Sequence, residues 1–453
     1  MVYTVCMSTH YTFKPHRFTL QFKSSEKATV HGGQLAIVAV LEHFGLKKRV
    51  RAHKALDPRT DKHKGYDPEV YVAGIIFAMT SGGCTLSEVE NLNKDEALKA
   101  FLGIKKFPDE SSIGEWLRNV GEEGAEAVRL IVRDFVGWSL SQAEPRRYRH
   151  GGQVECFFDD TQIEVSGKNF EGAKINYEGE VALGWQTLWV GPFLADGVLG
   201  AEGDVSSQLP CLIKGNGHLW KKEEAYLYAD SGSSAGVYLD AISSGFGQWS
   251  VSYNKWTEPL ERQAEEFAEG YWSKAVERRG PKGDLLREQY AWLKHQPAGG
   301  KEPVQYAVAR YRGATDLFFG YSFIASHSQD GSAQAVFERH RLKGDFERRF
   351  SELLSDLDLH HPPCADLGAN RTYYALATLA YDILQALKLI WMPADQQSFR
   401  IRTLIHRLLL IPVEIKRHAR QIAACFYLPA HAAAWWRQFV ELLLPRCRVL
   451  LSG

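Results

Sequence analysis

The sequence predicts a mixed α/β protein in which a sheet-forming core lies between two helical regions. From about Gly33 to Leu140, apolar residues recur at three-and-four spacing between Gly and Ser breaks, as in amphipathic helices. After residue 150 the pattern changes to short runs rich in aromatic and β-branched residues, which is typical of strands. Helical periodicity returns near Ala333. This order predicts an all-helical N-terminal region, a mixed-sheet core and C-terminal helices.

Composition limits the classes of function. With 453 residues and 45% hydrophobic content, the chain can bury more than one core, and we expect roughly two or three domains. The formal net charge is zero, which by itself disfavours a polyanion-binding protein. Basic residues are nevertheless concentrated in segments 45–65, 146–150 and 400–420. Such clusters are either solvated faces or phosphate-binding surfaces.

Cysteine usage and hydropathy indicate the compartment. The seven cysteines lie far apart and form no CxxC pair, which argues against a disulfide framework or a cysteine zinc site. The N-terminus lacks the charged and apolar regions of a secretory signal, and no run approaches about eighteen uninterrupted apolar residues. We therefore expect a cytoplasmic protein with no membrane association.

The core is predicted element by element from its short apolar runs. Its order reads as three strands, a helix, a strand, a helix and a strand. The expected strands are VECFFDD, VALGWQTLWVG, PFLADGVLG, AYLYAD and QWSVSYN, and the expected helices are SQLPCLIKGNGHLW and SAGVYLDAISSG. A charged stretch from Trp256 to about His295 follows, and then two strand-like runs, VQYAVARYR and DLFFGYSFIAS. Composition marks this part as an insertion. ANRTYYALATLAYDILQALKLIW and FRIRTLIHRLLLIPVEIKRHARQIAACFYL are expected to be helical.

Three acidic residues carry the functional prediction. Asp159 ends the first strand, Asp230 ends AYLYAD, and Glu347 lies in the helical stretch HRLKGDFERRFSELLSDL. Ligands in open α/β sheets collect at the carboxyl ends of strands. Three carboxylates are oxygen ligands that Mg²⁺ prefers, and a pair of such ions suits phosphodiester chemistry. Singly, the aspartates also read as turn or capping residues and the glutamate as a solvent-facing residue.

Alternation along the first strand leaves the choice between two neighbouring aspartates open. Asp159 shares a side with Phe157 and Ile163, whereas Asp160 shares the other side with Phe158. Both sides are apolar, so the strand is expected to be central. A carboxylate buried there needs a positive partner.

Three blocks around these acids resemble the DDE transposases of bacterial insertion sequences. They are FFDDTQIEVSGKNFEGAKINYEGEVALGWQTLWVGPFLADGVLG, YLYADSGSSAG and FERRFSELLSDLDLHHPPCADLGANRTYYALATLAYDIL. The chain is most similar to the thirteen-eighty family of the insertion-sequence-four-like superfamily, over nearly its whole length. The resemblance implies a ribonuclease-H-like core with a β-rich insertion. It also implies cleavage at terminal inverted repeats and strand transfer into target DNA, with a pair of Mg²⁺ or Mn²⁺ ions and a homodimer on double-stranded DNA in the bacterial nucleoid.

The resemblance assigns residues one by one. It implies Asp159, in a D-x-T context, Asp230 and Glu347 as the catalytic and metal-binding residues, and thus selects Asp159 over Asp160. The superfamily helix reads Y-x2-R-x3-E-x6-K, and here His340, Lys343 and Leu354 replace the tyrosine, the arginine and the lysine. A lysine lacks the bidentate phosphate geometry of arginine, and Leu354 offers no cation. The candidate DNA-binding residues are His340, Lys343, Arg348, Arg349, Lys47, Lys48, Arg49 and Arg51.

The expected organisation divides the chain into five parts. These are a helical domain for DNA binding or oligomerisation (1–150), the first part of the core (151–254), the insertion (255–329), the second part of the core with the glutamate helix (330–395), and a C-terminal helical region for DNA binding or oligomerisation (396–453). The insertion contains Trp256, Trp272 and Trp292, in a region where related enzymes place an aromatic that stacks on a flipped base. Core packing is the simpler interpretation of each.

Two other functions fit the same residues. One is a structure-selective nuclease with the same core and no strand transfer. The other is a catalytically inactive DNA-binding protein derived from a transposase, which the substitutions at His340, Lys343 and Leu354 favour.

Overall fold

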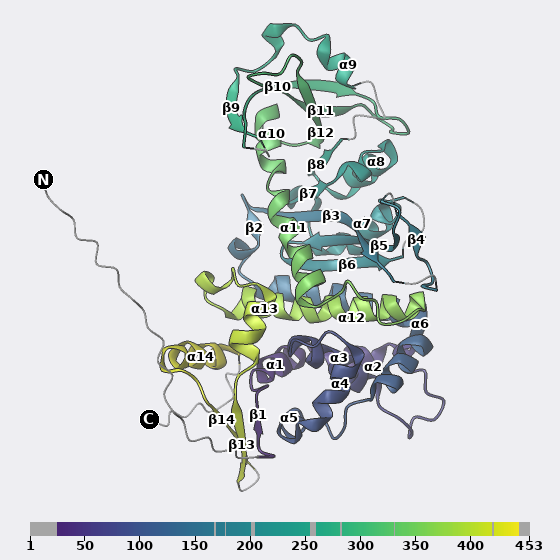
Figure 1. Cartoon of the computed structure of the whole chain (residues 1–453), viewed down its shortest axis with the longest axis vertical. Helices are drawn as coiled ribbons and strands as arrows, with labels where there is room; N and C mark the ends of the chain where they lie inside the picture. The colour runs from purple at the N-terminus through teal and green to yellow at the C-terminus, as the bar shows by residue number, and fades with distance from the viewer. Residues whose placement is uncertain are drawn as a thin grey trace, which may run out of the picture.

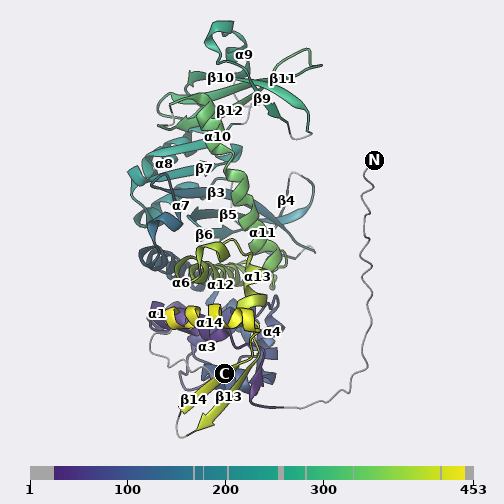
Figure 2. The ribbon, with the colours of Figure 1, turned by 90° about the vertical axis from the view of Figure 1, so that its left-hand side faces the viewer.

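The computed structural model describes residues 25–443 apart from 167–168, 177, 201–203, 254–259, 281–282, 330 and 419–420. Its centre is a sheet of 11 strands. Two long helices, α6 (Glu110–Gln142) and α12 (Leu367–Ala386), lie between this sheet and the N-terminal helices (Figure 1). The insertion forms one end of the elongated molecule, and the N-terminal helices lie towards the other end in Figure 2 as well.

The N-terminal region is mostly helical, as predicted. Its shorter helices are α1 (Gln34–Phe44), α2 (Leu46–Ala52), α3 (Pro68–Thr80), α4 (Leu86–Asn91) and α5 (Glu96–Leu102). Asp109 begins α6 by accepting a hydrogen bond from the Ser112 amide at 2.8 Å. The helix bends at Gly121, whose φ of 47° is left-handed. Thr372 of α12 donates to the Gly121 carbonyl at 3.0 Å, so the bend is held by the helix beside it.

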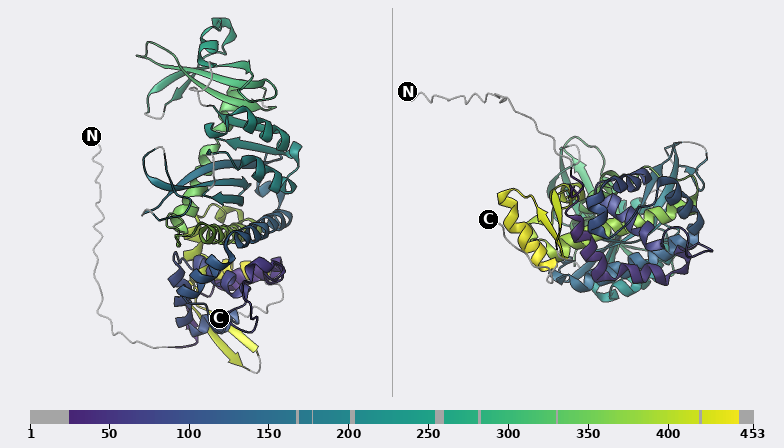
Figure 3. Two further views of the ribbon diagram at one scale, coloured as in Figure 1. Left: turned by 90° about the vertical axis from the view of Figure 1, so that its right-hand side faces the viewer. Right: turned by 90° about the horizontal axis from the view of Figure 1, so that it is seen from below.

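The terminal regions are not purely helical, which corrects two expectations. Strand β1 (Ala28–Thr29) pairs with β13 (Val413–His418), and β13 forms a hairpin with β14 (Gln421–Phe426). The preceding helical turn ends at Leu409, and Pro412, which lacks an N–H, could not have continued it; the run that follows alternates, with Val413 and Ile415 buried. We had expected a helix through this stretch. The hairpin and the N-terminal helices lie at the same end of the molecule in the left panel of Figure 3.

The core has the predicted order of strands and helices. It contains β3 (Gln153–Glu164), β5 (Val181–Val190), β6 (Phe193–Leu199), α7 (Leu209–Asn216), β7 (Ala225–Ala229), α8 (Gly236–Gly245) and β8 (Gln248–Ser252). The short strands β2 (Arg149–His150) and β4 (Lys174–Ile175) pair with β3 and β5. Strand β3 is central, antiparallel to β5 and parallel to β7, and β7 is parallel to β8. This mixed α/β sheet is consistent with a ribonuclease-H-like core.

The insertion extends the core sheet rather than forming a separate one. Its elements are α9 (Leu260–Glu265), β9 (Val276–Arg279), β10 (Leu285–His295), β11 (Val304–Gly313) and β12 (Gly320–His327). Strand β12 pairs with β8, which joins the insertion to the core. Two of these strands, β9 and β10, lie in the charged stretch where no strand was predicted. On β10 only Glu288, Tyr290, Ala291 and Leu293 are buried, and the apolar Leu285 is exposed, so the apolar signal was diluted.

The remaining elements return to the core. They are α10 (Ala333–His340), α11 (Lys343–Ser351) with a π-helical turn (Glu352–Asp356), α12, a π-helical turn (Leu387–Trp391), α13 (Ile401–Leu404), a π-helical turn (Ile405–Leu409) and α14 (Ala430–Leu443). The glutamate helix was expected to be continuous but is interrupted at Arg341 and Leu342.

Among the described residues, no helix has both the length and the apolar content that a membrane span requires.

Candidate active site

The two catalytic aspartates of the sequence prediction lie next to each other. Strands β3 and β7 are parallel, and the last pair in their register is Phe158 with Ala229. Asp159 and Asp230 are the next residues, so they lie side by side where this pairing ends. Asp230 directly follows β7, as predicted, but Asp159 was expected to end its strand and lies instead in the middle of β3, which continues to Glu164 in its pairing with β5. The side chain of Asp159 is 17% exposed and that of Asp230 is 54% exposed. In the described part of the chain the Asp230 carboxylate does not cap the turn after it, which disfavours the capping interpretation.

Helix α11 is held against this part of the sheet by aromatic packing. The ring of Phe346 stacks on Phe157 of β3, with centroids 4.2 Å apart, and meets Trp189 of β5 edge-on at 4.8 Å. Phe350, one turn later, contacts Trp189 at 5.4 Å. These contacts bury one face of the helix and place its first residue, Lys343, beside Asp159 of β3 and Asp230 after β7.

Lys343 joins the two aspartates. Its ammonium donates to Asp230 Oδ2 at 2.6 Å and lies 3.9 Å from Asp159 Oδ2. Burial lowers the pKa of Lys343, but the charges of Asp159, Asp230 and Glu347 outweigh it, so the pKa is raised and the ammonium stays charged. Burial also raises the pKa of Asp159 to about 7, against the opposing effect of Lys343. The Asp159 carboxylate is therefore only partly ionised at neutral pH, and a further cation beside it would favour the ionised form.

Asp159 and Asp160 have different environments. Asp160 accepts a hydrogen bond from Gln162 Nε2 at 2.7 Å, and burial raises its pKa to about 6. Of the two, only Asp159 has a described contact with Lys343. This geometry favours Asp159 as the site residue, in agreement with the D-x-T pattern.

Glu347 lies one helical turn after Lys343 and is exposed. Among the described residues its carboxylate has no hydrogen bond or ion pair, and no three His, Cys, Asp or Glu side chains lie close enough to hold a metal ion. The structure thus brings together Asp159 and Asp230 and leaves Glu347 on the adjoining helix. The donor chemistry nevertheless fits a hard divalent cation, because two carboxylates converge on a positive charge and a third is within electrostatic reach of it.

His340 and Leu354 have structural surroundings. His340 is 9% exposed, and its two ring nitrogens lie 2.8 Å from Ser250 Oγ and 2.8 Å from Ser252 Oγ on β8. Burial lowers the pKa of His340 to about 4, so the ring is neutral at pH 7. Leu354 packs against the main hydrophobic core. The alternating serines of QWSVSYN could have indicated these contacts, but the sequence prediction gave His340 only a DNA-binding role.

The arginines after Glu347 differ from each other. Arg349 donates to the Gly191 carbonyl and its guanidinium lies 5.7 Å from the centre of the Phe346 ring. It therefore fastens α11 to the core. Arg348 is exposed on the outer side of the helix.

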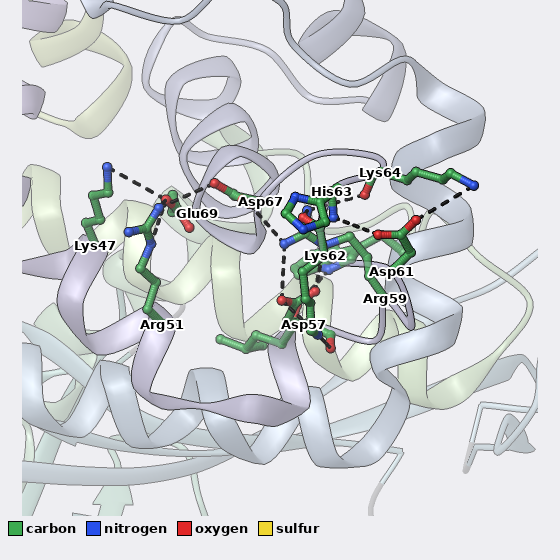
Figure 4. A network of polar contacts seen from close by, with 12 residues as sticks. Lys47, Arg51, Asp57, Arg59, Asp61, Lys62, His63, Lys64, Asp67 and Glu69 are labelled. Atoms are coloured by element: carbon green, nitrogen blue, oxygen red, sulfur yellow. Dashed lines mark hydrogen bonds and ion pairs between the residues drawn. The ribbon is translucent and has the colours of Figure 1, made fainter.

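The predicted basic segment 45–65 is largely neutralised within the protein (Figure 4). Arg51 contacts both Glu69 and Asp67, and Lys47 lies 3.8 Å from Glu69. Arg49 pairs with Asp134 of α6. Lys48 is exposed and has no described acidic partner. Within the segment 400–420, Arg400 pairs with Asp356 at 3.1 Å, and residues 419–420 lie outside the described part.

The tryptophans of the insertion are accounted for in part. Trp272 is buried under the guanidinium of Arg310, which lies 4.5 Å from its ring centre. Trp292 packs on a small apolar cluster beside α10. Trp256 lies outside the described residues. For Trp272 and Trp292 the structure agrees with the packing interpretation.

Comparison with known proteins gives the family. The family model described as transposase DDE domain group 1 matches residues 194–445, more than half of the chain. A search of curated proteins found no match to the chain. The matched region contains Asp230, Lys343 and Glu347, while Asp159 lies before it on the strand that pairs with β7. The chain therefore belongs to the DDE-domain transposases, a family whose members act on DNA as transposases with endonuclease activity.

Proposed function

We propose that the protein is a metal-dependent cut-and-paste transposase of the insertion-sequence-four-like, thirteen-eighty type. It cleaves DNA at the terminal inverted repeats of its own element and joins the ends to target DNA. It acts as a homodimer on double-stranded DNA in the bacterial cytoplasm. The observation that supports this most directly is the convergence of Asp159 and Asp230 on one positive charge beside the helix of Glu347.

The residues would divide the work by position. Asp159, in the middle of β3 and largely buried, and Asp230, directly after β7 and open to solvent, would hold cations where a phosphodiester can approach. Glu347 completes the site from α11. Two Mg²⁺ or Mn²⁺ ions bound there would activate the attacking water or 3′-hydroxyl and stabilise the leaving oxygen. The buried Phe157–Phe346 contact keeps water from the side of the site that faces the core.

DNA is gripped mainly through phosphates in this proposal. Lys48 and Arg348 are exposed and are the candidates for phosphate contacts. Lys47, Arg49 and Arg51 each have an acidic neighbour. His340, neutral and bonded to two serines, is a positioning residue for α10 and not a phosphate contact.

The test replaces Asp159, Asp230 and Glu347 separately with alanine and measures cleavage and strand transfer on terminal-repeat DNA with Mg²⁺. Each variant is expected to lose cleavage by several orders of magnitude while folding normally. Asp160→Ala is the matched control, because it removes the neighbouring carboxylate of the same strand and should keep cleavage. Full cleavage by any of the three variants would remove that residue from the proposal.

An inactive DNA-binding protein is the second candidate, favoured by the position of Glu347 apart from the two aspartates. It predicts DNA binding without cleavage for the unaltered chain at any Mg²⁺ or Mn²⁺ concentration. A structure-selective nuclease would instead cut junction DNA. Inverted repeats flanking the gene would favour a transposase, and their absence would favour the nuclease.

A further inference from the structure

Lys343 occupies the place where the two aspartates converge. Its side chain is 6% exposed, and its described acidic contacts are Asp230 at 2.6 Å and Asp159 at 3.9 Å. Burying an ammonium is costly unless carboxylates compensate it. These two carboxylates provide the compensation, so the contact is part of what stabilises the protein in the absence of other cations.

The fold fixes the position of the Lys343 backbone. The chain turns at Arg341 and Leu342, which ends α10 and begins α11 at Lys343. His340 anchors the end of α10 to two serines of β8, and Phe346 anchors the first turn of α11 to Phe157. The lysine backbone is thus fixed on both sides, beside Asp159 and Asp230.

The ammonium and a divalent ion compete for the same oxygens. Asp230 Oδ2 already accepts from Lys343 Nζ at 2.6 Å. Mg²⁺ binds carboxylate oxygens at about 2.0–2.1 Å and favours octahedral geometry. A cation bridging Asp159 and Asp230 would therefore lie against the ammonium, and the two positive charges would repel each other. One of them must leave before the other binds both aspartates.

We propose that Lys343 is a tethered counter-ion that closes the metal site in the free protein and releases it when a DNA phosphate takes over the ammonium. This inference rests on the proposed function. The Lys343 ammonium needs to move only a short distance to reach solvent, because the Asp230 side chain that it contacts is 54% exposed and the lysine side chain is flexible. Metal and DNA then bind with positive coupling, since each removes the obstacle to the other. The free protein holds metal weakly and becomes competent on DNA.

The experiment measures Mn²⁺ affinity of the full-length protein by electron paramagnetic resonance, with and without a short duplex of arbitrary sequence. Lys343→Met removes the charge and keeps the length of the side chain. It should bind Mn²⁺ more tightly than the wild type by at least about fivefold without DNA, the lower end of typical coupling between sites. DNA should tighten Mn²⁺ binding in the wild type and have little further effect in this variant.

Three controls separate the possible causes. Lys214→Met removes an exposed lysine on α7 and should behave like the wild type. Lys343→Arg keeps the charge and should keep weak Mn²⁺ binding without DNA. Asp159→Ala should abolish specific binding, and thermal unfolding of each variant shows whether it is folded.

The outcomes distinguish this inference from the proposed function. Equal or weaker Mn²⁺ binding by Lys343→Met, with specific binding in the wild type, overturns the counter-ion role and leaves the metal-dependent function standing. An absence of Asp159-dependent Mn²⁺ binding in all variants, with DNA present, overturns both. If Lys343→Met binds Mn²⁺ more tightly but the duplex does not tighten Mn²⁺ binding by the wild type, the proposed release by DNA is overturned.

Discussion

The rings of Phe157 and Phe346 are nearly parallel, with an interplanar angle of 3° and centroids 4.2 Å apart. Phe157 lies two residues before Asp159, and Phe346 lies directly before Glu347. The stack therefore connects the strand of the first aspartate with the helix of the glutamate. Aromatic packing sets the separation of these two acidic side chains, since they have no described contact with each other.

Phe346→Ala should disable the site without removing any carboxylate. Truncating a buried phenylalanine costs about 3–5 kcal/mol, and α11 would lose its contacts with both Phe157 and Trp189. We expect a lower free energy of unfolding in urea and a loss of cleavage at temperatures where the variant is still folded. Phe346→Leu is the control and should be less affected in both. Unchanged cleavage by the alanine variant would show that the stack does not position Glu347.

His340 should make stability depend on pH in the acidic range. Its pKa is lowered by burial from the ordinary value of 6.5 to about 4. The unfolded chain then binds a proton at a higher pH than the folded one, so this contribution is complete above pH 6.5 and is lost as pH falls towards 4. The slope approaches about 1.4 kcal/mol per pH unit within that window. Urea unfolding at several pH values measures it.

The control for this prediction is His340→Gln, whose amide can still bond to Ser250 and Ser252 and does not titrate. The variant should lose much of the pH dependence between 6.5 and 4 and little of the stability at pH 8. Lys343 and Asp230 are the charged groups that also act on the pKa of His340, Lys343 lowering it and Asp230 raising it. An unchanged pH profile in the glutamine variant would contradict the assignment.

Asp196 should be essential for joining the N-terminal helices to the core. Its side chain is fully buried on β6 and binds Arg129 at 2.7 Å and Arg133 at 2.6 Å, both on α6. Asn216 of α7 donates to the same carboxylate at 2.8 Å. Asp196→Ala would leave two arginines without their buried partner, which costs about 3–5 kcal/mol. Calorimetry should show a marked loss of thermal stability.

Asp196→Asn keeps the shape and one acceptor, so it should be intermediate. Glu126, about half exposed, also pairs with both arginines. Glu126→Ala is therefore the matched surface control and should cost much less, within about 1 kcal/mol. Equal effects of the two alanine variants would contradict a role for burial.

The sequence predicted the order of the core because each element has a strong local signal. VECFFDD and AYLYAD are apolar enough to read as central strands, and they are β3 and β7. Strand β10 was missed because the polar run Arg287–Gln289 divides its apolar residues within a charged segment. The hairpin β13–β14 was read as helix because its apolar residues also fit a helical period, and only Pro412 marked the change.

The sequence predicted the acidic residues of the site, but not which basic residues are paired with acidic ones. The end of the run AYLYAD placed Asp230, and the pairing of β3 with β7 brought Asp159, in the middle of β3, beside it. That Lys343 would lie between them depends on the break before α11 and on the Phe346 stack, which are tertiary features. The neutralisation of segment 45–65 also depends on Asp67, Glu69 and Asp134, which come from helices beyond that segment.

The ion pairs of segment 45–65 give a last prediction about DNA binding. Lys48 is exposed without a described acidic partner, whereas Arg51 is held by Glu69 and Asp67. A cation that contacts a phosphate releases a counter-ion, and its removal lowers the slope of log K against log salt by about 0.9. If this segment grips DNA, Lys48→Ala should lower that slope, measured by fluorescence anisotropy of a labelled duplex. Arg51→Ala should change it less, because the arginine must first leave its acids. A larger slope change for Arg51→Ala than for Lys48→Ala would show that these ion pairs open on DNA.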